Sequence, residues 1–195
     1  ETAEMPGMYE KDDFDLAGFV VGAVEKKDML DASTVIKGDL LLGLPSSGLH
    51  TNGFSLVRQI LELDPDPSVL REVYPELGRS LGEELLEPHR SYYPLVEPVI
   101  GMVKGMAHIT GGGLIENVPR ALPEGLGAQL DTKSWQVPTI FTILQEKGDV
   151  ALEEMYRVYN MGLGLVLVCD PARKEEVLSL LPESRVVGEV TELNG

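Results

Sequence analysis

The chain has 195 residues, of which 43% are hydrophobic and 25% charged, a mixture typical of a globular protein. Its net charge of −16 disfavours nucleic acid and anionic membranes as partners, and no apolar run approaches the roughly 20 residues that span a bilayer. Cys169 is the single cysteine, so an intrachain disulfide and a cysteine-rich metal site are excluded, which fits a reducing, cytoplasmic location.

The apolar patterns alternate between strand and helix along the chain. They predict, in order, a strand over 16–26, a turn at 37–39 with a strand ending at 45, a helix over 52–63, proline-broken short helices over 70–94 and a helix over 95–105. They then predict a strand at 106–109, a glycine-rich loop and helix over 110–122, a strand at 127–131, helices at 137–148 and 150–159, a strand at 162–170, a helix at 171–181 and a strand at 185–190. The predicted fold is therefore α/β (α+β), with a layered mixed β-sheet flanked by helices.

The same patterns indicate the domain organisation. No low-complexity linker divides the chain after residue 30, so we predict one domain over residues 28–195. Residues 1–27 read as the tail end of a preceding domain. Because the chain starts at Glu1 with "ETAEMPGMY", we expect a fragment whose upstream half is missing.

Two polar, glycine-rich loops each lie between a predicted strand and a predicted helix. The first contains Ser46, Ser47, Gly48 and Asn52, and the second contains Thr110, Gly111, Gly112 and Gly113. Backbone amides of such loops, together with a helix N-terminus, can hold a phosphate group. Each loop also carries a histidine, His50 or His108, which can donate to a phosphate or move a proton.

Simpler interpretations compete with this one. Asn52 and Thr110 could be ordinary helix N-caps, although a cap does not require three consecutive glycines. A loop histidine is more often structural than catalytic, and we expect His89, beside Arg90 between two helices, to be of that kind. Glu1 and Glu4 could help hold a magnesium ion, but surface solvation explains them better. Cys169, on an apolar strand, is expected to be a buried small hydrophobe.

Four segments together resemble one enzyme family. These are "ETAEMPGMY", "LPSSGLHTNGFSLVR", "HITGGGLIENVPRALPEGLGAQLD" and "YNMGLGLVLV", which occur in the order found in aminoimidazole ribonucleotide synthetase, also called phosphoribosylformylglycinamidine cyclo-ligase. The resemblance covers nearly the whole chain. It implies that the chain is the C-terminal α/β domain of that enzyme with the last strand of its N-terminal domain.

The resemblance also implies an activity. The family uses ATP to close the ring of formylglycinamidine ribonucleotide, forming aminoimidazole ribonucleotide, ADP and phosphate in purine biosynthesis. It implies Mg²⁺, usually K⁺, a cytoplasmic homodimer, and an N-terminal domain that carries most of the ATP site. A phosphorylated ribonucleotide would lie between the domains, with His50 and His108 as catalytic residues. Without the upstream half, the chain is expected to be inactive.

Two alternatives remain open from the sequence. Another ATP-dependent member of the same superfamily, such as formylglycinamidine synthase or selenophosphate synthetase, would share the architecture. A non-catalytic phosphate-binding module would keep the loops but perform no chemistry.

Overall fold

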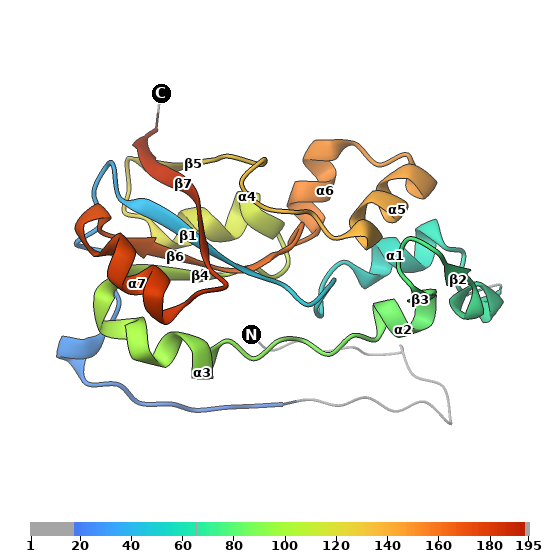
Figure 1. Ribbon diagram of the computed structural model, residues 1–195, viewed down its shortest axis with the longest axis horizontal. Helices are drawn as coiled ribbons and strands as arrows, with labels where there is room; N and C mark the ends of the chain where they lie inside the picture. The colour runs from blue at the N-terminus through green and yellow to red at the C-terminus, as the bar shows by residue number, and fades with distance from the viewer. Residues whose placement is uncertain (1–17, 65, 194–195) are drawn as a thin grey trace.

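The computed structural model describes residues 18–64 and 66–193 (Figure 1). Its strands are β1 (Leu40–Pro45), β2 (Val73–Tyr74), β3 (Arg79–Ser80), β4 (Val103–His108), β5 (Leu126–Leu130), β6 (Leu163–Cys169) and β7 (Arg185–Glu192). Its α-helices are α1 (Phe54–Ile60), α2 (Leu81–Leu85), α3 (Tyr93–Val96), α4 (Gly113–Asn117), α5 (Thr139–Gly148), α6 (Leu152–Val158) and α7 (Lys174–Leu180). Its 3-10 helices are η1 (Lys26–Asp28), η2 (Pro67–Arg71), η3 (Glu97–Met102), η4 (Val118–Ala121) and η5 (Pro171–Arg173).

Five strands form one sheet in the order β4-β6-β1-β7-β5. The α/β class with flanking helices is confirmed, but every pairing in this sheet is antiparallel, so the expectation of mixed strand directions is wrong. Strand β6 lies inside the sheet and is buried along its whole length, as its unbroken apolar run predicts. Among the described residues, no helix has the length and apolar character required to cross a membrane.

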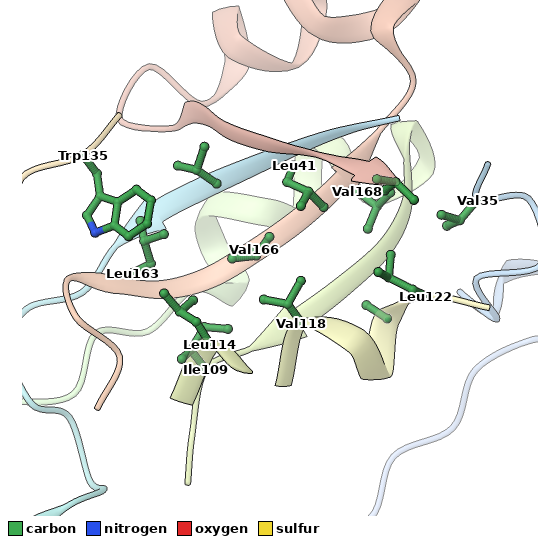
Figure 2. Close-up of a cluster of buried hydrophobic side chains, with 14 residues drawn as sticks. Val35, Leu41, Ile109, Leu114, Val118, Leu122, Trp135, Leu163, Val166 and Val168 are labelled. Carbon is green, nitrogen blue, oxygen red and sulfur yellow. The ribbon is translucent and has the colours of Figure 1, made fainter. Parts of the chain in front are cut away.

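Helical segments cover both faces of the sheet. On one face, Leu114 and Val118 from α4 and η4 pack against Val166 and Val168 of β6 (Figure 2). On the other face, α3, η3 and α7 cover Leu165 and Leu167 of the same strand. From Leu165 to Cys169, successive residues of β6 therefore enter opposite cores, because side chains alternate across a strand.

A third core joins α1, α2, α5 and α6 beyond one end of the sheet (Figure 1). Phe141 of α5 is fully buried here, and Val57 of α1 is buried with it. The two-stranded sheet β2-β3 adjoins this group. It was not predicted, because the prolines in this region indicated short helices instead of strands. This helical group supports the loop that follows β1.

Two other segments differ from the sequence prediction. Residues 18–25, within the predicted strand 16–26, are extended but have no ladder partner in the described part of the chain. Their side chains are exposed, with Phe19 at 85% and Val20 at 92%. The helix predicted to reach residue 105 ends at Met102, because Val103 to His108 pair with β6 and gain ladder hydrogen bonds there.

Candidate functional site

The two polar loops meet at one edge of the sheet. Strands β1 and β4 both pair antiparallel with β6, so both end at the edge where β6 begins. The first loop follows Pro45, and the second follows His108. A Cβ atom placed on Gly111 would lie 3.5 Å from Oδ1 of Asn52, so the loops are in contact range. The fold thus brings together the two motifs that the sequence singled out.

His50 is held in a strained and buried position. Its φ of 61° lies in the left-handed region, which non-glycine residues rarely occupy, and its side chain is only 4% exposed. The Ser47 amide donates to its Nε2 over 3.1 Å, so the neutral ring carries its proton on Nδ1. That Nδ1–H is buried and finds no hydrogen-bond partner among the described residues. His50 is therefore an unused donor in the site.

His89, which the sequence analysis left as a structural residue, lies beside both predicted histidines. Its ring stacks on His50 with centroids 3.9 Å apart, and its Nε2 lies 3.2 Å from Nε2 of His108. Its Nδ1 lies 3.4 Å from Oγ1 of Thr51. The hydroxyl of Ser47 donates to the Pro88 carbonyl and so ties the first loop to this segment. No periodic pattern in the sequence could have placed His89 here, because it lies in an irregular connection.

Desolvation favours the neutral form of each histidine, most strongly for His50, which is buried, and less for the partly buried His89 and the exposed His108. Desolvation lowers the pKa of His50 to about 4, with smaller contributions from His89, His108 and the Arg90 guanidinium. Desolvation also lowers the pKa of His89, and it lowers the pKa of His108 with help from His89. Near neutral pH the cluster therefore consists of uncharged imidazoles, which donate and accept hydrogen bonds but do not supply a positive charge.

Tyr92 and Gly164 form the support beneath the cluster. The Tyr92 hydroxyl donates to the Pro45 carbonyl over 2.8 Å, and the ring contacts both His50 and His108 edge-on. Burial raises the Tyr92 pKa far above its ordinary value, so the phenol stays protonated. A Cβ atom on Gly164 would overlap the Tyr92 hydroxyl and would lie 2.6 Å from Cε1 of His50. Glycine at this point of β6 is what allows the rings to approach the sheet.

Asn160 fixes the first loop and was missed from the sequence. Its side-chain amide donates to the carbonyls of Gly48 (2.8 Å) and Leu49 (3.2 Å). Its Oδ1 accepts from the Ser46 hydroxyl at 2.9 Å and the Gly162 amide at 2.8 Å. Asn160 is only 3% exposed, so these bonds have little competition from water. One buried amide therefore sets the backbone that carries His50.

Replacing Asn160 with alanine should lower the free energy of unfolding by about 2–4 kcal/mol. The change leaves buried hydrogen-bonding groups of the loop without a partner, and each such group costs about 1–3 kcal/mol. Urea denaturation of both proteins measures the difference. Ser33→Ala removes an exposed hydroxyl bonded to Asp31 and should stay within about 0.5 kcal/mol of the parent. Equal stability of the Asn160 and Ser33 variants would show that these bonds contribute nothing net.

Asn117 performs the same task in the second loop. Its Nδ2 donates to the carbonyls of Gly111 (3.1 Å) and Gly113 (2.8 Å), and Thr110 donates its hydroxyl to Oδ1 over 3.3 Å. The Gly113 amide donates to the Thr110 carbonyl over 3.0 Å, which leaves the amides of Gly111 and Gly112 as the donors that a phosphate could use.

The capping interpretation of the loops is wrong. The N-cap positions of α1 and α4 are Gly53 and Gly112, and neither helix has a side-chain cap. Asn52 and Thr110 therefore do not act as caps. These helices have only seven and five residues, so the loops' backbone amides, rather than a helix dipole, would have to hold an anion.

The other predicted site residues have defined places. Ser46, Ser47 and Gly48 bond within the protein, as described above, and serve to shape the first loop. Glu1 and Glu4 lie outside the described residues.

A cavity of about 380 Å³ opens beside the cluster and is lined by His89, Arg90, Ser91, Tyr92, Tyr93, His108 and Leu165. Arg90 is paired with Glu183 at 2.7 Å at this opening.

The chain is similar in sequence to known proteins along nearly its whole length. The chain is 48% identical over 197 aligned residues to a phosphoribosylformylglycinamidine cyclo-ligase of Bifidobacterium longum subsp. infantis, covering 98% of this chain and 57% of that protein. It is 51% identical over 198 residues to the protein of that name from Geobacillus thermodenitrificans, covering 98% and 57%. The chain thus spans a little over half the length of the curated relatives that it matches.

Among solved structures, PurLQS from Thermotoga maritima aligns with a TM-score of 0.48 and 16% identity, covering 87% of this chain and 24% of that chain. This likeness is too weak to support a functional conclusion. The family model described as AIR synthase related protein, C-terminal domain, matches residues 37–195, a stretch that includes both loops and all three histidines. The chain therefore belongs to the family of AIR synthase related proteins and contains the C-terminal domain of that family.

Proposed function

We propose that this chain is the C-terminal part of a phosphoribosylformylglycinamidine cyclo-ligase. In this reaction ATP activates the formyl oxygen of formylglycinamidine ribonucleotide as a phosphate ester, and a substrate nitrogen then attacks that carbon. Ring closure yields aminoimidazole ribonucleotide, ADP and phosphate. The observation that carries the proposal is identity of about half of all residues with relatives of that name, along 95–100% of the chain.

The proposal includes a domain boundary between residues 27 and 28. Residues 1–27 would complete an upstream ATP-binding domain, and residues 28–195 would form the domain that carries the histidine cluster. The exposed apolar side chains of Phe19, Val20 and Val21 support this division, since an unpaired β-prone segment is suited to a sheet in another domain. The proposed whole enzyme is a cytoplasmic homodimer that binds ATP and Mg²⁺, with K⁺ as a further ion.

The site residues take the following proposed roles. The amides of Gly111 and Gly112 hold a phosphate group, either that of the substrate or the one transferred from ATP. The His50 Nδ1–H donates to an oxygen on which negative charge grows as phosphate departs. His108, which lines the cavity, supports the transfer of the proton released from the attacking nitrogen. The depressed pKa and occupied Nε2 of His50 support the role of donor rather than base.

Magnesium does not fit the histidine cluster. Mg²⁺ requires oxygen ligands, whereas the described cluster offers imidazole nitrogens. These histidines are therefore not proposed as Mg²⁺ ligands.

The deciding experiment measures ADP release in the protein with its upstream half restored. ADP formation that depends on formylglycinamidine ribonucleotide is the expected result. A folded protein that binds ATP but releases no substrate-dependent ADP would refute the cyclo-ligase proposal. ATP consumption that depends instead on selenide would move the assignment to another member of the superfamily, selenophosphate synthetase.

A further inference from the structure

Two imidazole nitrogens face each other at the mouth of the site. Nε2 of His89 and Nε2 of His108 are 3.2 Å apart and form a hydrogen bond in which one ring donates, so a bound metal would replace the shared proton; the two rings are tilted by 51°. Two histidines bound to one tetrahedral Zn²⁺ at about 2.0–2.1 Å place their nitrogens roughly 3.3–3.4 Å apart. The separation between these nitrogens is therefore close to that of a zinc chelate.

The surroundings of the pair suit a metal ion. The Oγ1 of Thr51 lies 3.4 Å from Nδ1 of His89, where a hydroxyl can accept the Nδ1–H and direct Nε2 toward a metal. The pair lines the 380 Å³ cavity, which provides access from solvent and room for further ligands. Arg90, a cation that lines the same cavity, is paired with Glu183, which reduces its repulsion of a bound metal.

His50 is excluded as a third ligand by its geometry. Ligand atoms of all three histidines lie within 4.8 Å of one another, which by itself would permit a three-histidine site. However, the His50 ring is stacked on His89 with only 18° between their planes, so their in-plane lone pairs do not converge on one point. Its Nε2 already accepts the Ser47 amide, and its Nδ1 carries the proton.

We propose that His89 and His108 chelate one borderline divalent cation of the Zn²⁺ class through their Nε2 atoms, with the remaining positions open to water or an anion. Imidazole favours Zn²⁺, Ni²⁺, Cu²⁺ and Co²⁺ over Mg²⁺, which distinguishes this site from the Mg²⁺ expected with ATP. The site stands independently of the cyclo-ligase reaction, since it requires only the observed ring positions.

The test is a calorimetric titration of the intact chain with ZnCl₂ in the presence of excess Mg²⁺. The excess Mg²⁺ occupies carboxylates of this acidic surface, whose net charge of −16 would otherwise attract cations. One equivalent of Zn²⁺ should bind. His89→Gln and His108→Gln should each weaken binding more than about tenfold, because even the outer-shell partners of metal ligands contribute that much. Co²⁺ should give the visible absorption of a nitrogen-ligated, tetrahedral ion with the parent chain and with neither of these two variants.

His50→Gln is the matched control, since it removes the one other imidazole in the chain. Its Zn²⁺ affinity should remain within about threefold of the parent, given that the stacked ring contributes no ligand. Zinc should also raise the melting temperature of the parent and of this control, because a ligand that binds only the native state stabilises it. Zinc affinity that is unchanged in both His89→Gln and His108→Gln would overturn the proposal. A loss in His50→Gln as large as in those two would overturn the two-ligand assignment.

Discussion

Replacing His50 with alanine should lower kcat about 10²- to 10³-fold in the enzyme with its upstream half restored, with a smaller effect on KM. A pre-placed donor to a developing oxyanion contributes about that much in other enzymes. We propose the Nδ1–H of His50 as such a donor, because it is buried without a partner among the described residues and its ring is fixed by the Ser47 amide. Steady-state ADP release measures the change.

The matched variants for this prediction separate chemistry from folding. His108→Ala should also lower kcat, by about 10²-fold or more if it assists proton transfer. Arg58→Ala removes an exposed cation whose ion-pair partner among the described residues is Asp64, at 3.0 Å, and should leave kcat within about twofold. If both histidine variants fold and turn over within about twofold of the parent, the catalytic assignment of the cluster is wrong.

Replacing Gly113 with alanine should lower the free energy of unfolding by about 3–4 kcal/mol, the largest stability effect that we expect from a single methyl group. Gly113 has a φ of 57°, in the region that costs other residues about 1–2 kcal/mol. Its new Cβ would also overlap the Tyr156 carbonyl and lie 2.9 Å from the Arg157 carbonyl. Both are backbone atoms of α6 and cannot rotate away. Chemical denaturation of the chain gives the value.

Alanine substitutions at two other glycines separate the cost of the positive φ from the cost of the steric overlap. Gly78 has a φ of 68° but open space around its Cβ position, so Gly78→Ala should cost only the backbone term of about 1–2 kcal/mol. Gly101 has open space and no positive φ, so Gly101→Ala should change stability by less than about 0.5 kcal/mol. A Gly113 variant no less stable than the Gly78 variant would show that α6 moves freely away from the second loop.

Local sequence signals predicted much of the fold. The apolar run of β6, the helical spacing of α1 and the proline-to-glycine span of α5 each depend on neighbours in the chain. The predicted ends of these three elements lie within a few residues of the observed ends. The strand predicted over 16–26 shows the limit of this reasoning, because its propensity is real but its described residues have no partner strand. The same limit applies to β4, where pairing with β6 replaced a predicted helical end.

The sequence by itself determined the two glycine-rich loops and their histidines, since glycine and hydroxyl residues between a strand and a helix have a local meaning. Only the tertiary structure brought His89 between them, 3.9 Å from the His50 ring and 3.2 Å from His108. It also decided that Asn160 holds the loop from 112 residues away. These contacts depend on antiparallel pairing of β1 and β4 with β6, a long-range choice that apolar periodicity within a single strand does not encode.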